Sequence, residues 1–550
     1  MKRIFSFITP TLVSRAYVAT LSVCALAMVA CTDDPTTGET PDKPTTDVEV
    51  DKIVEWMDGR LQKEYYWMEE YNDKRSTFNM SLEWDEYLDA TLLKLNTNID
   101  DGNVSNGKRY LYTYVDRKKD NSASATTRSD FPVEEGYGIE LSSFVVTFSG
   151  IDKYTDGNYG FPIEHAYPAS SADEEGLKRG DVIVEVNGSP ITRTNYSKLW
   201  TELRAGEGSA DVRVYGYDDE EEEYVFFDCT LTSKSYEENP VAFGDLLTID
   251  SEKIDIGDKK IGYLCYLSFE SDFDQKLVEA VENLIAKGAT DVILDLRSNG
   301  GGHVTSSVLL ASMLLDESYV GPGKVYARLK HNPNNKVYDD EEYTLQKRYT
   351  PNGSSTSVDV PNLGLKKVWI ICSEDSASAS EMVIVGLRGL DVEVELVGNI
   401  TEGKNCGMEV TSKTHDGYKY SFAPITFMNE NGKGFSDYGD GIVPEHYLYE
   451  KSNSKTLKES LRSACAYYPI PITVWGDVEN DIALCETVMQ ICGTTLFAPS
   501  AKSSSSQTLT TRAAASTMPQ RTDIRMEKTD LKSRGMIVRE QDIEQMRNNR

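Results

Sequence analysis

The feature that most constrains the fold is an alternation of short apolar runs and amphipathic stretches between residues 261 and 397. The predicted strands cover residues 261–267, 291–296, 367–372 and 392–397, and the predicted helices cover residues 272–287, 303–315 and 378–390. Parallel strands need a long crossover connection, and a helix is the usual one. The alternation therefore predicts an α/β unit with a parallel or mixed sheet.

The rest of the chain divides into regions of different pattern. Apolar residues at helical spacing, such as Ile53, Met57 and Leu61, predict helices near the N-terminus, whereas the pattern after about Phe131 is typical of strands. We predict a tether at 31–47, a helical domain at 48–130 and a β domain at 131–235. An α/β core at 240–450 and a helical element packed on the core at 451–500 are expected to follow. Residues 501–550 are predicted to be a mostly disordered tail, and a short helix at its end stays open. The expected fold class is thus α+β, with several domains.

Residues 1–30 have the pattern of a secretory signal. A basic start is followed by an apolar run over residues 16–30, which is too short to span a bilayer comfortably. The run ends in the motif MVAC at residues 28–31, which resembles a bacterial lipobox. This resemblance implies cleavage before Cys31 and lipidation of its thiol; the alternative is an ordinary signal peptide with an incidental cysteine.

The residues after Cys31 bear on the cellular location. Thr32-Asp33-Asp34 resembles the acidic export tag of some surface-exposed Gram-negative lipoproteins. The implied location is the cell envelope of a Gram-negative bacterium, with a lipid anchor in the outer membrane. Both the periplasmic and the surface face stay open.

Charge and cysteine usage exclude two classes of partner. The chain has 57 Lys and Arg against 89 Asp and Glu, a formal net charge of −32, so a nucleic acid backbone would meet a like-charged field. The nine cysteines are irregularly spaced, with no CxxC pair and no Cys/His cluster, so no metal site is expected. One disulfide stays open.

A glycine-containing turn and a later glycine-rich run suggest a peptide-binding domain. Gly136-Tyr137-Gly138-Ile139 precedes a β-rich run, and residues 176–188 read GLKRGDVIVEVNG. Together they resemble a PDZ domain of the bacterial protease type. The resemblance implies that the turn at residues 136–139 holds a peptide's terminal carboxylate and that the neighbouring strand edge adds the peptide as a further strand. The alternative is a β-rich spacer that binds nothing.

Two strand-to-helix junctions carry the chemistry. The first is DLRSNGGG at residues 295–302, and the second is SASASE at residues 376–381. Helix N-termini offer unpaired N–H groups with positive partial charge, and glycines allow close approach of a substrate. A small hydroxyl residue at such a junction is well placed for nucleophilic attack on a carbonyl.

A serine nucleophile needs a base. None of the five histidines has a spacing that indicates a Ser-His-Asp arrangement, although a triad is spatial. Lys404, in a glycine-bearing loop after a predicted strand, is the other candidate, since burial can lower a lysine pKa toward neutrality. From the residues alone, both Ser378 and Lys404 also fit purely structural roles.

These motifs together resemble the carboxyl-terminal processing peptidases, also called tail-specific proteases. The matching elements are DLRSNGGG at 295–302, SASASE at 376–381, VGNITEGK at 397–404 and GIVP at 441–444. The resemblance implies a ClpP/crotonase-like core, a Ser378 nucleophile and a Lys404 general base. It also implies an oxyanion hole formed by the backbone N–H of Ala379 with that of Gly301 or Gly302.

The implied function is that of a lipid-anchored extracytoplasmic serine endopeptidase that takes peptide or unfolded C-terminal tails, without a metal or organic cofactor. Three features depart from the pattern: the serine–lysine spacing is longer by one residue, Met408 replaces a glutamine that orients the lysine, and Glu445 replaces aspartate. The alternatives are a non-catalytic peptide-binding lipoprotein of the same fold and a crotonase-like acyl-CoA enzyme. The oligomeric state cannot be predicted.

Overall fold

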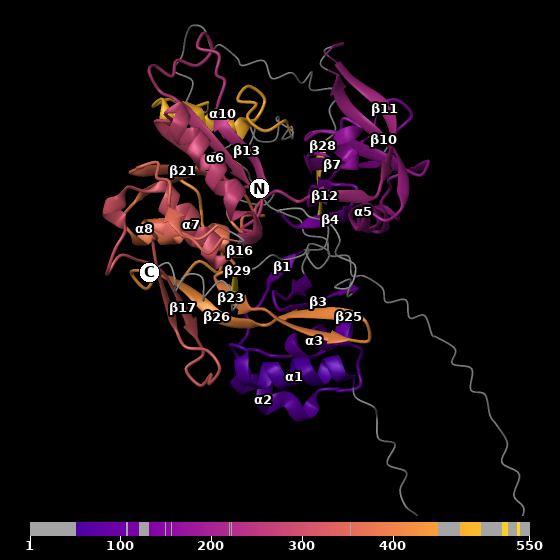
Figure 1. Ribbon diagram of the computed structural model, residues 1–550. Helices are drawn as coiled ribbons and strands as arrows, with labels where there is room; N and C mark the ends of the chain where they lie inside the picture. Colours follow the sequence, from indigo (N-terminus) through magenta and orange to yellow (C-terminus); the bar gives the residue numbers. More distant parts are fainter. Residues whose placement is uncertain are drawn as a thin grey trace, which may run out of the picture. The chain divides into compact units, whose positions relative to one another are not determined.

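The computed structural model describes most of the chain beyond residue 50 (Figure 1). The described residues are 51–105, 108–119, 131–148, 150–155, 157–218, 220–221, 223–351, 354–448, 473–496, 520–525 and 536–538. They belong to one compact unit. The predicted signal, the lipidation site Cys31 and the tether lie outside the described residues, as do residues 451–472 of the predicted C-terminal helical element.

The predicted alternation forms a six-stranded sheet, here called the core sheet. Its strands, in spatial order, are β13 (Val241–Leu246), β14 (Ile261–Tyr266), β15 (Asp291–Asp295), β21 (Lys367–Cys372), β22 (Glu393–Gly398) and β27 (His446–Tyr447). The strands from β14 to β27 run parallel, whereas β13 pairs antiparallel with β14. The strands and helices predicted between residues 261 and 397 are confirmed to within two residues.

Helices cover both faces of the core sheet. They are α6 (Asp274–Lys287), α7 (Val304–Leu314) and α8 (Ala379–Gly389) on one face and α10 (Ile482–Ile491) on the other. In β14, Leu264 packs in the cluster of α6, α7 and α8, whereas its neighbour Tyr263 packs in the cluster of α10. Both faces are apolar because successive strand residues point to opposite sides and each side has its own helical cover.

A second six-stranded sheet, here called the slot sheet, packs on the other side of α7 and α8. Its strands, in spatial order, are β16 (Gly302–His303), β29 (Met536–Val538), β23 (Cys406–Glu409), β26 (Ile425–Asn431), β17 (Val325–His331) and β18 (Glu341–Thr344). The core lies between the two sheets, where Phe427 and Tyr326 meet the helices. A two-stranded pair, β19 (Arg348–Tyr349) and β20 (Val358–Asp359), lies between β18 and β21 in sequence.

The N-terminal unit contains the predicted helices and also strands. Its helices are α1 (Lys52–Glu64), α2 (Met68–Lys74) and α3 (Trp84–Leu92), and its strands are β1 (Asn103–Ser105), β2 (Lys108–Tyr110) and β3 (Tyr114–Lys119). β3 pairs with β25 (Tyr418–Ala423), which in turn pairs with β24 (Thr411–His415). Residues of α1 and α3 share a hydrophobic cluster with Cys406, Met408 and Phe422. The unit is therefore continuous with the slot sheet.

Residues 133–237 form a β-rich unit, here called the β unit. Its elements are β4 (Val133–Gly136), β5 (Ile139–Leu141), β6 (Phe144–Thr147), β7 (Tyr159–Ala166), α4 (Ser171–Glu174), β8 (Val182–Val186), β9 (Ser189–Pro190), α5 (Tyr196–Ala205), β10 (Ser209–Asp218), β11 (Glu223–Thr232) and β12 (Lys234–Glu237). Its main sheet has the order β11-β10-β8-β7-β6, with α5 packed on its core. The strands predicted after Phe131 are thus present.

The prediction of a disordered tail is wrong for two segments. Residues 520–525 form β28 (Gln520–Arg525), which pairs with β6, and residues 536–538 form β29 in the slot sheet. Both strands complete sheets whose edges come from distant parts of the chain. The tail has no extended alternating pattern of its own, so its sequence alone does not indicate these strands.

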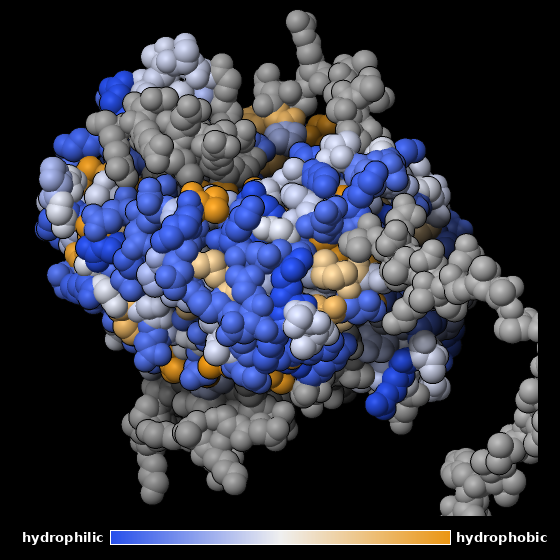
Figure 2. Space-filling view, turned by 90° about the horizontal axis from the view of Figure 1, so that it is seen from below, coloured by the Kyte–Doolittle hydropathy of each residue, from blue (hydrophilic) through white to orange (hydrophobic). Residues whose placement is uncertain are grey.

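The acidic composition agrees with the molecular surface. The face seen in Figure 2 is mostly hydrophilic, with small scattered hydrophobic patches. No helix in the described part of the chain is long and apolar enough to cross a membrane.

Candidate active site

Ser378 occupies a strained turn between β21 and α8. The residue is fully buried and has φ 62° and ψ −109°. A positive φ costs a non-glycine residue roughly 1–3 kcal/mol and persists only where the surroundings fix the backbone. The strain marks Ser378 as a functional candidate on grounds independent of its motif.

The buried carboxylate of Glu381 joins the Ser378 turn to the Lys404 loop. Its Oε2 accepts hydrogen bonds from Ser378 N at 2.9 Å and from Lys404 N at 2.8 Å. Its Oε1 accepts from Thr401 Oγ1 at 2.6 Å and from Gly403 N at 2.8 Å. Burial raises the pKa of Glu381 to about 7, against the effect of the four donors. The two predicted catalytic residues therefore share one anchoring oxygen.

The side chain of Lys404 lies in a buried environment, with 1% of the residue exposed. Burial lowers the pKa of Lys404, although Cys406 and nearby acidic groups act to raise it. Its Nζ lies 4.5 Å from the centre of the Tyr112 ring, within the range of a cation–π contact. Met408 packs instead in the cluster of the N-terminal unit. Tyr112 is thus a described contact of the lysine side chain, and the sequence analysis missed it.

The N-terminal unit also holds the lysine loop through Glu402. The hydroxyls of Tyr110 and Tyr112 both donate to Glu402 Oε1, the latter at 3.1 Å. Asn103 Nδ2 donates to the Glu402 backbone oxygen at 3.0 Å. No motif marks these residues, because they lie about 300 positions from Glu402 in sequence.

The GIVP element braces the same loop. Ile442 N donates to Thr401 Oγ1 at 2.7 Å, and Thr401 N donates to the Ile442 oxygen at 3.2 Å. Gly441 has φ 87°, and a Cβ there would lie 2.3 Å from the Thr401 oxygen. Glu445, which departs from the sequence pattern, accepts from Arg388 at 2.8 Å and from Leu396 N at 3.0 Å. It therefore ties the end of α8 to β22.

Asn299 links the two strand-to-helix junctions. Its backbone oxygen accepts from Ala377 N at 3.2 Å and from Ser380 Oγ at 2.8 Å. Its Oδ1 accepts from Gly301 N at 2.9 Å, so that amide is directed into its own turn. Ala379 is the first residue of α8, where backbone N–H groups have no intrahelical acceptor. The predicted oxyanion elements are therefore neighbours across Asn299.

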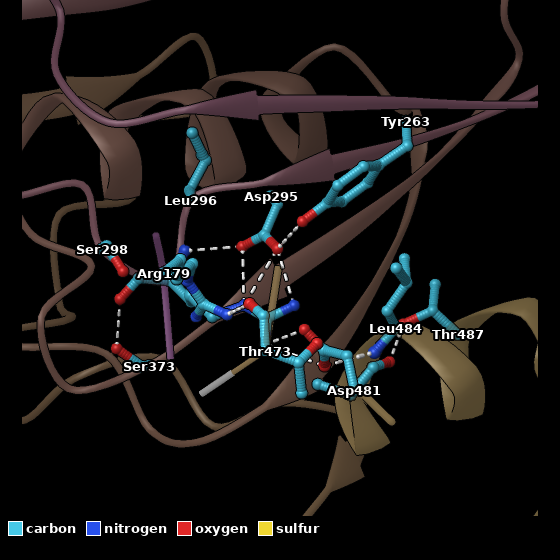
Figure 3. Close-up of polar contacts among 12 residues, drawn as sticks. Arg179, Tyr263, Asp295, Leu296, Ser298, Ser373, Thr473, Asp481, Leu484 and Thr487 are labelled. Carbon is cyan, nitrogen blue, oxygen red and sulfur yellow. Dashed lines mark hydrogen bonds and ion pairs between the residues drawn. The ribbon is translucent and has the colours of Figure 1, made fainter. Parts of the chain in front are cut away.

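The charged residues of the first junction have a structural role, drawn in Figure 3. Asp295 accepts from Tyr263 Oη at 2.6 Å and from Arg297 Nε at 2.9 Å, and Arg297 Nη1 reaches Asp481 at 2.8 Å. Asp481 caps α10 by accepting from Leu484 N at 3.0 Å. This buried network fixes the end of β15, from which the glycine loop begins.

The predicted carboxylate-binding turn is tightly packed in the β unit. Ala172 N donates to the Tyr137 oxygen at 3.0 Å and Tyr167 N to the Gly138 oxygen at 2.9 Å. A Cβ at Gly138 would lie 2.0 Å from Ser170 Cβ, so only glycine fits there. Ile139 is buried in the β-unit core.

A cavity of about 210 Å³ begins immediately after this turn and reaches the lysine. Its lining from the β unit includes Glu140, Leu141 and Phe144, and its lining from the core includes Gly300, Ala377 and Lys404. Tyr110 and Tyr112 complete one wall. The cavity therefore joins β5 and β6 of the β unit to the lysine loop.

The remaining polar groups include a histidine near the glycine loop, the Ser378 hydroxyl and the side chains that could bind a metal. His303 Nδ1 accepts from Ser271 N at 3.2 Å and lies 3.7 Å from Glu270, so it is engaged with the loop after β14. The hydroxyl of Ser378 accepts a hydrogen bond from Met536 N of β29. Among the described residues, no group of three or more His, Cys, Asp or Glu side chains could hold a metal ion.

Comparison with known proteins finds similarity in the core. Residues 260–447, from β14 to β27, match the family described as Peptidase family S41. The carboxy-terminal processing protease CtpA of Bacillus subtilis (strain 168) is 22% identical over 354 residues, which are 63% of this chain and 60% of that protein. A CtpA-like serine protease of Staphylococcus aureus (strain N315) is 23% identical over 277 residues, 50% of this chain and 47% of that protein. The chain thus spans less than two thirds of either relative.

A solved structure supports the architecture. An S41 protease from Bacteroides fragilis NCTC 9343 has a TM-score of 0.55, with 20% sequence identity over 80% of this chain and 97% of that one. At this level of identity, the likeness shows a shared mixed α/β fold.

Proposed function

We propose that this chain, whose residues 260–447 match the family described as Peptidase family S41, is a serine endopeptidase acting on C-terminal tails. The predicted resemblance to C-terminal processing peptidases agrees with the relatives in Bacillus and Staphylococcus. The proposed substrates are extended peptides or unfolded protein tails.

In the proposed reaction, the Ser378 hydroxyl attacks the carbonyl carbon of the scissile amide while Lys404, in its neutral form, accepts the hydroxyl proton. The proton then passes to the leaving amine, and an acyl-enzyme remains on Ser378. Water, deprotonated by Lys404, hydrolyses the ester and restores the hydroxyl. The shared Glu381 oxygen and the lowered pKa of Lys404 support this pair.

The oxyanion of the tetrahedral intermediate needs two N–H donors. We assign these to Ala379, at the positive end of α8, and to Gly302. Gly302 is preferred to Gly301, because the Gly301 amide already donates to Asn299. A Cβ at Gly302 would lie 2.1 Å from the Phe269 oxygen, so the loop retains this path only with glycine.

The β unit is proposed to act as a PDZ domain that captures the substrate tail. The turn at residues 136–139 would bind the terminal carboxylate, and the edge of β5 and β6 would add the tail as a strand. The cavity from Glu140 to Lys404 would lead the substrate residues that precede its C-terminus toward Ser378. We further propose a ClpP/crotonase-like ancestry for the core.

Attachment to the outer membrane through lipidated Cys31 is a separate proposal. Its support is the lipobox-like motif and the acidic tag that follows it. The strongly acidic chain suits an extracytoplasmic protein, and nucleic acid is not a proposed partner.

The single observation that carries the catalytic proposal is the buried pair of Ser378 and Lys404 anchored on Glu381. The test is labelling of the full chain by a serine-directed fluorophosphonate, together with hydrolysis of casein. Wild type should label and cleave, whereas Ser378→Ala should do neither; Ser376→Ala is the matched control.

The alternative, a non-catalytic peptide-binding lipoprotein, predicts a different result. Wild type and Ser378→Ala would then bind an unstructured peptide equally and neither would cleave it. Cleavage by Ser378→Ala at the wild-type rate would remove Ser378 from the mechanism.

A further inference from the structure

The slot sheet is completed by a strand from the far end of the chain. β29 lies between β16 of the glycine loop and β23 of the lysine loop and runs parallel to both (Figure 1). Met536 is paired with Gly302 on one side and with Gly407 on the other. The strand therefore separates the two loops that carry the proposed oxyanion hole and base.

The fit of this strand is close. Met536 is fully buried and Val538 is 2% exposed, and both pack in the central hydrophobic cluster. Ile537 packs on the opposite side, against the cluster of the N-terminal unit. A Cβ at Gly407 would lie 2.2 Å from the Phe427 ring and 2.8 Å from Met536 Cβ, so glycine at this position makes room for both.

The strand also engages the nucleophile. Met536 N donates a hydrogen bond to Ser378 Oγ. The hydroxyl of Ser378 thus faces an N–H group, which it cannot attack as it would attack the carbonyl carbon of a substrate. In this arrangement, the strand occupies one of the two lone pairs of the hydroxyl oxygen and fills the space from which a substrate carbonyl would approach.

A second segment of the same tail occupies the edge of the β unit that is proposed to bind peptide. β28 pairs antiparallel with β6, with Arg521 opposite Val146 and Arg525 opposite Phe144. Phe144 also lines the cavity that leads to Lys404. The β6 edge, which is proposed to receive a substrate, and the slot between β16 and β23 are therefore both paired with strands of the chain's own C-terminal region.

We propose that β28 and β29 are a built-in competitor that blocks the peptidase by strand addition at the β6 edge and in the slot between β16 and β23. The proposal rests on the proposed peptidase function and adds a substrate class. A displacing substrate must be extended and must carry large apolar side chains at alternate positions, to replace Met536 and Val538 in their buried sites. Because the competitor is part of the same chain, its strand addition is intramolecular, and a free peptide must overcome the resulting effective concentration.

The test uses the full chain with Met536→Asp, which places a charge in a buried apolar site, and with the milder Met536→Ala. Asn549→Asp adds the same charge elsewhere in the tail and is the matched control. For Met536→Asp, kcat/KM on an unstructured fluorogenic peptide should rise at least about tenfold. The control should match wild type.

Amide hydrogen exchange tests occupancy without turnover. Fragments containing Cys406–Glu409 and Gly302–His303 should lose protection in Met536→Asp and keep it in the control. A synthetic peptide of residues 530–545, added in trans to Met536→Asp, should restore both protection and inhibition, and a scrambled peptide should restore neither.

Two outcomes overturn the proposal. Unchanged exchange in Met536→Asp would mean that β29 does not occupy the slot in solution. Increased exchange with unchanged kcat/KM would mean that the strand does not compete with substrate. If no variant cleaves peptides, the proposed function fails, and competition is then tested by binding alone. Fluorescence anisotropy would measure the affinity of a labelled apolar peptide for wild type and for Met536→Asp. Tighter binding to Met536→Asp would support competition, and equal binding would contradict it.

Discussion

At the scale of single residues, Glu381 has a positioning role in the proposed mechanism. It transfers no proton in the reaction scheme, yet it accepts hydrogen bonds from the backbone N–H groups of both Ser378 and Lys404, and two more from Thr401 and Gly403 of the lysine loop. A carboxylate suits this role because it offers only acceptors to four donors.

Glu381→Gln should therefore disturb the site although it preserves size. The glutamine amide group would present N–H donors to two groups that are themselves donors. A displacement of the nucleophile or base by about 1 Å can cost about a hundredfold, so kcat should fall by at least that factor with little change in KM. Peptide kinetics check this, with the exposed Glu393→Gln as control; a kcat within threefold of wild type would contradict it.

Lys404 gives a prediction for pH dependence. Burial lowers the pKa of Lys404 from its usual value, and the neutral form is the base. The rate should therefore rise with pH through the ionisation of Lys404 and level off above it. Lys404→Arg should lose at least about a hundredfold, because guanidinium keeps its proton in this range.

The measurement is a pH–rate profile of wild type with rates for Lys404→Arg and for the exposed control Lys433→Arg. An Lys404→Arg rate within tenfold of wild type would show that the lysine contributes only charge or packing. The base would then have to be sought among the histidines.

At the scale of elements, the glycine loop depends on a helix that follows it by almost two hundred residues. Arg297 connects Asp295 at the end of β15 with Asp481 at the start of α10 (Figure 3). Burial acts to raise the pKa of Asp481, but Arg297 and Arg179 outweigh it, and the pKa is lowered. α10 is thereby locked to the core sheet.

Asp481→Asn should destabilise this junction. Removing one partner of a buried ion pair costs about 3–5 kcal/mol, because the other charge stays buried. Since the folded-state pKa of Asp481 is depressed, the stabilisation is present above the unfolded value of about 3.9 and is lost as pH falls through the folded value. The difference in melting temperature between wild type and Asp481→Asn should thus be large at pH 7 and shrink below about pH 4. An equal difference at both pH values would contradict the ion-pair account.

At the scale of the whole molecule, the candidate site draws on every described region. The N-terminal unit supplies Tyr112 against the lysine, the β unit supplies one wall of the cavity, and the tail supplies β29. Any agent that displaces one region should therefore alter the chemistry of the core.

The proposed lipid anchor belongs to this scale as well. Wild type should be recovered in the membrane fraction, whereas Cys31→Ser should be soluble or keep its signal segment, because no thiol is available for acylation. Fractionation and intact mass of the two proteins, with Cys492→Ser as control, provide the measurement. An unchanged membrane fraction for Cys31→Ser would argue against lipidation.

Local pattern was enough to predict the elements of the core, whereas the two candidate catalytic residues were assigned through a family resemblance. Strand periodicity and helix periodicity are properties of neighbouring residues, so the elements between residues 261 and 397 could be found from the sequence. Ser378 was a candidate because it lies at a strand-to-helix junction, and Lys404 because it lies in a glycine-bearing loop after a predicted strand. Their catalytic roles were implied by the resemblance to carboxyl-terminal processing peptidases.

Tertiary structure alone decided which groups surround those residues. Tyr112, Glu402 and Met536 reach the site across large sequence separations, and no periodic pattern encodes such contacts. The three residues of β29 form a strand because β16 and β23 present two edges at the correct spacing. A short segment acquires its conformation from hydrogen-bond partners supplied by the fold, so its role became visible only once those partners were in place.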